Sequence, residues 1–219
     1  MNTLFLYMPL IAKGVGTTIS AWLCAAIGSF LIGLVFGVIS SNYLKYSKIG
    51  WAVKTYTFVA KGIPAYVQIL IAYFVLPSLL GFSIPPFLAA CCALMFCSGG
   101  YVTEIVRAGI NSVPKGQWDA AFVLGYPKIV ALKNIILPQA LRTVLPPLLG
   151  EFEQLLKSTS LLATIGVTEL TRAGQNIISR ELNPFAVYIM IACLYLLFSG
   201  IIQVVIYCLK KRKKCYGLC

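Results

Sequence analysis

The residues of this sequence with the most chemical potential are charged side chains within long apolar stretches. They are Lys61, Glu104, Glu151, Glu153 and Lys157. A charge in the middle of a bilayer costs about 3 kcal/mol on insertion scales, so charges kept there usually bind a ligand or pair with each other. The sequence contains no histidine, which removes the most common general base and metal ligand. The pattern favours binding of a polar ligand over catalysis, and it predicts no metal site.

Glu151 and Glu153 compete for the same role, because only one of them can face a given cavity. On one helix, side chains two residues apart point roughly 200° away from each other. Glu153 is followed four residues later by Lys157, the favourable order for an ion pair within a helix. Two alternatives stay open: Glu153 meets a cationic substrate, or it only pairs with Lys157. Because burying both charges costs more than deleting both, we expect a substrate to use the carboxylate.

Lys61 and Glu104 also have two interpretations each. Lys61 precedes Gly62 and Pro64, which predict an interrupted helix, and interrupted membrane helices often line ligand sites. The alternative is that Lys61 extends to the inner membrane interface. For Glu104, a structural ion pair with Arg107 is favoured over a ligand role. The predicted lining of the substrate path is Lys61, Gln68, Glu104, Glu153 and Lys157.

The elements that must position these residues are membrane-spanning helices. Of the 219 residues, 59% are hydrophobic and 11% are charged, and the mean hydropathy is +0.88, values typical of a polytopic membrane protein. The sequence predicts an all-α fold in one domain, residues 1–219, with five transmembrane helices and one long cytoplasmic loop. The predicted spans are residues 14–41, 55–80, 85–108, 138–160 and 183–209, and the loop is residues 112–137. Gly28, Gly33 and Gly37 give the first span a face that a second helix can approach closely.

The positions of lysine and arginine predict the orientation, because loops rich in these residues stay in the cytoplasm. Such residues precede the second span and fill the long loop: Lys45, Lys48, Lys54, Lys115, Lys128 and Lys133. The loop at residues 77–86 carries no charge and is predicted to lie outside. Residues 138–160 are the least apolar span, but counting them as a span keeps the basic residues 210–214 in the cytoplasm. The N-terminus is then outside and the C-terminus inside, and residues 161–181 lie outside or re-enter the membrane.

The net charge of +12 would suggest nucleic-acid binding in a soluble protein. Here the basic residues cluster between spans, so the positive charge is interpreted as the enrichment of lysine and arginine in cytoplasmic loops that sets the membrane orientation. No nucleic-acid partner is predicted.

Residues 115–142 form the longest stretch that is suited to water. Apolar residues recur at three- and four-residue intervals in its first part: Trp118, Ala121, Phe122 and Gly125. This spacing predicts a short helix over residues 115–124. Gly125 is expected to end the helix, because glycine adopts the left-handed conformation easily, and Pro127 suits the first turn of a second helix. A short amphipathic helix between spans fits a groove on another protein.

This stretch resembles the signature of the membrane subunits of ABC importers, in which Glu-Ala-Ala is followed by three residues, Gly, nine residues and Ile-x-Leu-Pro. Asp119-Ala120-Ala121, Gly125 and Ile135-Ile136-Leu137-Pro138 keep every spacing, and only Asp119 departs from the pattern. The flanks GYVTEIVRAGINSVPKGQWDAA and LPQALRTVLPPLLGEFEQLLKSTSLL are similar to the polar amino acid permease family. The similarity runs from about residue 14 to residue 207. Further departures are Lys61 in place of an arginine, Gly150 in place of an asparagine, and Glu153 in place of an apolar residue.

The resemblance implies the fold of a type I ABC importer permease in the bacterial cytoplasmic membrane. It implies that a cytoplasmic ATPase contacts the loop through Gly116, Gln117, Trp118, Asp119, Ala120, Ala121 and Gly125. An extracytoplasmic amino acid-binding protein, a second permease copy (identical or different) and the lipid bilayer are the other implied partners. The sequence contains no Gly-x-x-x-x-Gly-Lys-Ser/Thr, so ATP hydrolysis is assigned to a separate chain. The chain is therefore expected to be a transport subunit without cofactor, and not an enzyme.

The resemblance implies a polar amino acid as the substrate. Glu153 favours arginine or lysine over glutamine, because a cationic side chain makes charge-assisted hydrogen bonds to a carboxylate. Lys61 would meet the α-carboxylate of the substrate. Glutamine stays as the alternative within the family. The alternative from another class is a membrane interaction protein without transport.

Overall fold

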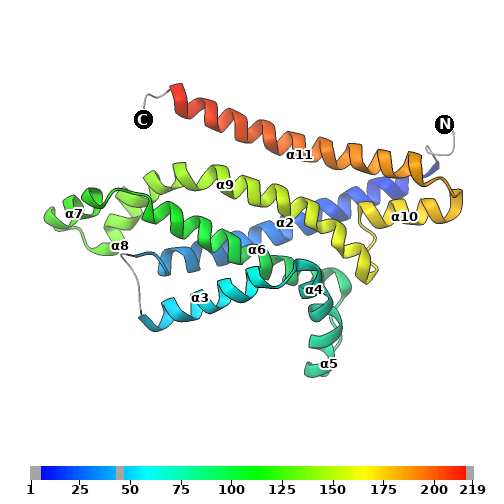
Figure 1. Ribbon diagram of the computed structural model, residues 1–219, viewed down its shortest axis with the longest axis horizontal. Coiled ribbons are helices and arrows are strands. Elements are labelled where there is room, and N and C mark those ends of the chain that lie inside the picture. Colours follow the sequence, from blue (N-terminus) through cyan, green and yellow to red (C-terminus); the bar gives the residue numbers. More distant parts are fainter. Residues whose placement is uncertain (1–5, 43–46, 216–219) are drawn as a thin grey trace.

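The computed structural model describes residues 6–42 and 47–215. Every regular element in these two ranges is helical, in agreement with the predicted all-α class. The long helices run side by side along the long axis of the molecule (Figure 1). Lys45, one of the residues behind the predicted orientation, lies outside the described ranges.

The elements follow one another in three groups. The first is α2 (Met8–Ile39), α3 (Ser47–Gly62), α4 (Ala65–Leu70), the π-helical turn η1 (Ile71–Val75) and α5 (Leu76–Leu80). The second is α6 (Pro86–Asn111), α7 (Lys115–Val123), α8 (Lys128–Ala131) and the π-helical turn η2 (Leu132–Ile136). The third is α9 (Leu137–Ser158), the 3₁₀ helix η3 (Thr159–Ile165), α10 (Leu170–Glu181) and α11 (Pro184–Cys215).

Helices α2 and α6 form the centre of the molecule, and glycines bring their backbones together. A Cβ atom added to Gly33 would lie 2.4 Å from the side chain of Val102, and one added to Gly37 would lie 2.6 Å from Val106. No side chain fits at these distances, so only glycine allows this approach. The predicted close-packing face of the first span is therefore confirmed.

In the described part of the chain, three helices are long and apolar enough to cross a membrane alone: α2, α6 and α11 as far as Leu209. Helix α2 begins at Met8, earlier than predicted, and α11 continues past the predicted end at residue 209. The predicted span at residues 55–80 is not one straight helix, since the chain bends by 102° between α3 and α4. The interruption that Gly62 and Pro64 predict is therefore present.

Helix α9 covers the predicted span at residues 138–160, but it is not apolar enough to be counted with the other three. Two of its charged side chains are turned toward other helices: Glu153 is buried, and Glu151 is partly buried. Average hydropathy is a poor guide to whether such a helix crosses the membrane, because the average ignores which side chains are enclosed by protein.

The two ends of the molecule differ. Helices α7 and α8 lie at one end and α10 at the opposite end, and α11 runs from the α10 end back towards the α7 end (Figure 1). Residues 161–181, which the sequence left unplaced, fold into η3 and α10. Helix α10 packs on the first turns of α2, where Thr18 Oγ1 accepts a hydrogen bond from the Leu170 backbone N–H at 3.1 Å.

Glu169 fastens this end of the molecule. Its fully buried carboxylate caps α10 by accepting hydrogen bonds from the backbone N–H groups of Thr171 (2.7 Å) and Arg172 (2.8 Å). The Tyr195 hydroxyl on α11 donates a third, at 3.1 Å. Burial raises the pKa of Glu169, and these hydrogen bonds oppose the rise. The carboxylate thus ties α10 to α11 from an enclosed position.

Candidate functional site

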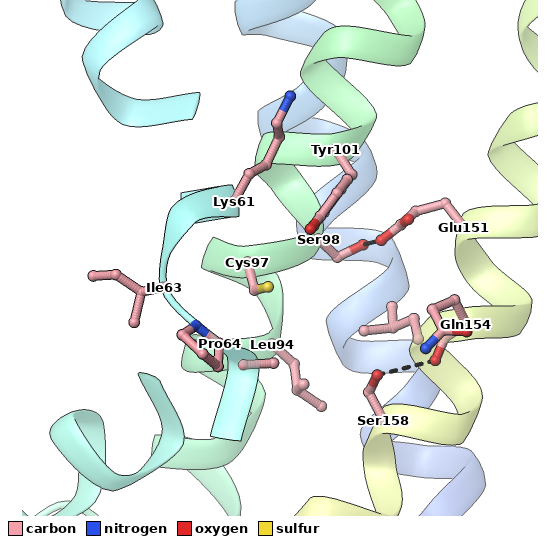
Figure 2. Close-up of a pocket in the computed structure, with 12 residues that line it drawn as sticks. Lys61, Ile63, Pro64, Leu94, Cys97, Ser98, Tyr101, Glu151, Gln154 and Ser158 are labelled. Carbon is pink, nitrogen blue, oxygen red and sulfur yellow. Dashed lines mark hydrogen bonds between the residues drawn. The ribbon is translucent and has the colours of Figure 1, made fainter. Parts of the chain in front are cut away.

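A cavity of about 300 Å³ lies where the bend between α3 and α4 meets α6 and α9. Its lining comes from three places in the chain, and Figure 2 shows Ser98 and Glu151 meeting there while the Lys61 and Ile63 side chains extend away from that pair. The bend supplies Lys61, Ile63, Pro64 and Ala65; α6 supplies Leu94, Cys97, Ser98 and Tyr101; and α9 supplies Glu151, Gln154, Leu155 and Ser158. The volume is at the lower end of the range for small-molecule sites.

The bend opens this cavity because the helix stops at a proline. Pro64 has no backbone N–H, so it cannot continue the hydrogen-bond pattern of α3, and its φ of −56° and ψ of 137° turn the chain away. The new direction carries α4 off at an angle, and the residues on either side of the break form one wall of the cavity. The lysine predicted from the sequence, Lys61, lies on this wall.

Two side chains of opposite charge line the cavity. Glu151 on α9 accepts a hydrogen bond from the Ser98 hydroxyl on α6 at 2.8 Å. Lys61 lies with its ammonium nitrogen 5.9 Å from the centre of the Tyr101 ring, within the range of a cation–π contact. An α-amino acid carries a carboxylate and an ammonium group, so a cavity with one cation and one anion matches its charges.

Glu153 and Lys157 lie outside this cavity and pair with each other. Lys157 Nζ donates to Glu153 Oε1 at 2.6 Å, and Gln203 Nε2 on α11 donates to the other carboxylate oxygen. Glu151 lines the cavity and Glu153 does not, because side chains two residues apart on a helix point roughly 200° away from each other. The ion pair considered from the sequence is present, and a role of these residues in the substrate path stays a prediction.

Glu104 and Gln68 are likewise absent from the lining. Glu104 pairs with Arg107, as the structural interpretation expected. Gln68 is buried, and its amide donates hydrogen bonds to the backbone carbonyls of Ala60 and Ile63, both at 2.8 Å. Of the predicted path residues, the structure therefore brings only Lys61 to the cavity, and the other predictions stay untested.

The sequence does contain a signal for the residues that were missed. Those on α6 and those on α9 each recur at positions i, i+3, i+4 and i+7, the spacing of one helix face. On α9 this face begins at Glu151 and includes Gln154 and Ser158. The choice of Glu153 followed its departure from the family pattern instead of this periodicity.

The loop between α6 and α9 has the predicted helix–turn–helix form. Helix α7 is closed by Gly125, whose φ of +79° is the left-handed conformation expected for it. The Tyr126 backbone N–H reaches back to the Ala121 carbonyl at 3.0 Å, which completes the helix end. Helix α8 follows directly after Pro127.

Helix α7 has one buried face and one exposed tip. Trp118 and Ala121 are buried against Ile110, Leu132 and Ile136, so the apolar stripe fixes the helix onto the base of α6 and α9. Phe122, predicted as part of that stripe, is instead partly exposed. The largest exposed apolar side chains of the tip are Val123 (88% exposed), Leu124 (74%) and Ile129 (72%). Gly116, Gln117, Asp119 and Ala120 are also exposed.

The chain resembles known proteins along nearly its whole length. Residues 30–214 match the family described as binding-protein-dependent transport system inner membrane component. The putative glutamine transport system permease protein of Rickettsia conorii is 32% identical over 202 residues, 92% of each chain. The arginine transport system permease protein of Bacillus subtilis is 38% identical over 167 residues, 75% of this chain and 74% of the relative.

A solved structure agrees with the family match and with these two relatives. The crystal structure of an amino acid ABC transporter with histidines superposes with a TM-score of 0.87 at 32% sequence identity, covering 95% of this chain and 96% of the other. The cavity, the loop and these similarities lead to one assignment. The chain belongs to the binding-protein-dependent transport system inner membrane components, and its relatives are permease subunits of amino acid ABC transporters.

Proposed function

We propose that this chain is the membrane-spanning subunit of an ATP-driven importer and that its cavity at the α3–α4 bend conducts a polar amino acid. The observation that carries the proposal is that a cation and an anion, Lys61 and Glu151, line the same small cavity. A zwitterionic substrate offers a group of opposite charge to each of them.

The tip of α7 is the proposed contact with the ATPase. Val123, Leu124 and Ile129 are among the more exposed apolar residues of the chain, and they lie in a loop outside the candidate spans. This chain leaves them exposed, and exposed apolar clusters of this kind mark contacts with another protein. Because Trp118 and Ala121 pack with residues of α6 and of η2, which leads directly into α9, a movement of the tip would be passed to the helices that line the cavity.

Five crossings are proposed: α2, the bent segment α3–α5, α6, α9 and α11. Helix α9 is included because its two glutamates have partners within the protein: Glu151 accepts from Ser98, and Glu153 pairs with Lys157. The N-terminus is then outside and the C-terminus in the cytoplasm. A chain with so few spans forms only part of a translocation path, so a second permease copy, identical or different, is proposed to complete it.

The orientation can be tested by labelling two exposed serines. In a background without the eight native cysteines, a cysteine at Ser78, beside the uncharged loop, should react with a membrane-impermeant maleimide added outside. A cysteine at Ser112, at the end of α6, should react only after the membrane is permeabilised. The reverse pattern would invert the orientation, and labelling of both from outside would remove one of the five crossings.

The substrate is proposed to be a basic amino acid, with arginine favoured. Lys61 already has compensation, because it lies in the last turn of α3, near the negative end of the helix dipole, and beside the Tyr101 ring. Among the described residues, the hydrogen-bond partner of Glu151 is the neutral hydroxyl of Ser98. Glu151 is thus the less compensated charge and favours a guanidinium or ammonium side chain. Glutamine remains the alternative, with its α-ammonium group at Glu151.

The function is tested by transport in proteoliposomes that contain the permease together with the ATPase and the binding protein of the same importer. Uptake of radiolabelled arginine is expected only with ATP inside and binding protein outside, and excess unlabelled lysine should compete more strongly than glutamine. ATP-dependent uptake that glutamine blocks better would select the alternative substrate. Absence of ATP-dependent uptake for every polar amino acid would favour an interaction protein without transport.

A further inference from the structure

Gln68 connects the two sides of the bend that shapes the cavity. Its side chain is buried at the start of α4, and its amide nitrogen donates to the carbonyl of Ala60 in α3 and to the carbonyl of Ile63 in the break, both at 2.8 Å. Both amide hydrogens are therefore used to hold backbone groups on the far side of Pro64.

These two carbonyls lack their usual helical partners because of the break. The Ala60 carbonyl would bond to the N–H of residue 64, which proline does not have. The first backbone carbonyl to accept a helical hydrogen bond in α4 is that of Pro64, from the Gln68 N–H at 3.1 Å. The Ile63 carbonyl lies one residue before it and is left out of this pattern. Ala60 is fully buried, and an unpaired carbonyl there would be strongly unfavourable, so the donor from the Gln68 side chain matters most for this atom.

The side-chain oxygen of Gln68 indicates that the two bonds donated by its amide nitrogen fix the orientation of the side chain. Its Oε1 is buried and has no hydrogen-bond partner among the described residues. Turning the amide over would satisfy neither carbonyl and would bring oxygen against oxygen. The two donor bonds thus fix the side chain, at the expense of an unpaired oxygen.

Gln68 does not line the cavity, but the residues whose position depends on the bend do: Lys61, Ile63, Pro64 and Ala65. We propose that Gln68 is a positioning residue that sets the angle between α3 and α4 and thereby holds Lys61 at the cavity. Its effect on the substrate passes through Lys61. This role replaces direct contact with the substrate, and its effect on uptake rests on the proposed transport function.

The first arm of the test measures the bend without using transport. Spin labels at Thr55 on α3 and Ser78 on α5, both exposed, report the distance across the bend when labelled permease is diluted with unlabelled copies in the assembled complex. Gln68→Met, which keeps the length but has no donor, should shift and broaden the distance distribution. Gln68→Asn, which keeps the amide but is one carbon shorter, should give a smaller change. The control Gln175→Met, on α10, should leave the distribution unchanged.

The second arm measures uptake. Gln68→Met is expected to raise the substrate concentration for half-maximal uptake about tenfold, with a smaller change in the maximal rate. In a Lys61→Met background the same substitution should add less than twofold, because the cation that it positions is already gone. An unchanged distance with a tenfold rise in half-saturation would mean that Gln68 contacts the substrate itself and would overturn the proposal. Unchanged distances in both Gln68 variants would overturn it as well, even if the complex transports nothing.

Discussion

Arginine uptake by a Glu151→Gln variant is expected to need about tenfold more substrate for half of its maximal rate than uptake by the parent. Glu151 lines the cavity, and the Ser98 hydroxyl is its hydrogen-bond partner among the described residues. A guanidinium group at this carboxylate would make charge-assisted hydrogen bonds, which are about twice as strong as bonds between neutral groups. Losing that difference costs about 1.4 kcal/mol, which corresponds to the tenfold change.

The same variant distinguishes the two ways in which a substrate can use Glu151. If the side chain of the substrate meets the carboxylate, uptake of arginine and lysine falls while competition by glutamine changes little. If the α-ammonium group meets it, all amino acids lose affinity alike. Half-saturation for each substrate, measured in proteoliposomes with the same amount of complex, separates the two cases.

Glu153→Gln is the matched control, because it makes the same change two residues away on the same helix. Glu153 lies outside the cavity and pairs with Lys157 and Gln203. The arginine concentration for half-maximal uptake by the Glu153→Gln variant should therefore stay near that of the parent. Should Glu153→Gln impair arginine uptake while Glu151→Gln does not, Glu153 is the substrate carboxylate, as the sequence first suggested. Recovery of that loss in a Glu153→Gln, Lys157→Gln double variant would instead assign it to the broken ion pair.

A Gly125→Val substitution is expected to reduce ATP-driven uptake by tenfold or more and to lower the amount of ATPase that purifies with the permease. Gly125 has a φ of +79°, and a β-branched residue in this left-handed conformation is strained by about 2 kcal/mol or more. No atoms lie within 4 Å of an added Cβ, so the effect would come from the backbone and not from a clash. Relief of the strain would reorient Val123, Leu124 and the turn into α8.

Gly81 offers a control with the same backbone geometry in a different place. It has a φ of +74°, ends α5, and also has no atoms within 4 Å of an added Cβ. Gly81→Val should therefore carry a similar strain and similar membrane insertion, but it should retain the ATPase. Equal loss of ATPase in both variants would point to general instability. A Gly125→Val complex with normal ATPase content and uptake would refute the coupling role of this turn.

Local features could be predicted because neighbours in the sequence set them. The end of α7 at Gly125 follows from the conformational freedom of glycine, and the break after Gly62 follows from the missing N–H of Pro64. The close face of α2 follows from small residues at Gly33 and Gly37, where any side chain would collide with α6. Each of these signals is complete within a few residues, so the sequence alone was enough.

The candidate site required distances between segments that lie far apart in the chain. The periodicity of α9 states that Glu151 and Glu153 point in different directions, but it does not state which direction faces α6. That depends on the packing of α9 between α6 and α11, where Ser98 meets one glutamate and Gln203 the other.

The sequence by itself determined the helical class, the short helix α7 and the break at Pro64, because backbone chemistry and side-chain periodicity act over single helix turns. Only the tertiary structure decided that the chain turns by 102° at the break, that Lys61 and Glu151 line one cavity, and that the Gln68 side chain bonds to the Ala60 carbonyl on the other side of the break. These arrangements depend on which helices pack together. A helix taken alone does not determine which of its faces meets a neighbouring helix, and the packing of distant segments makes that choice.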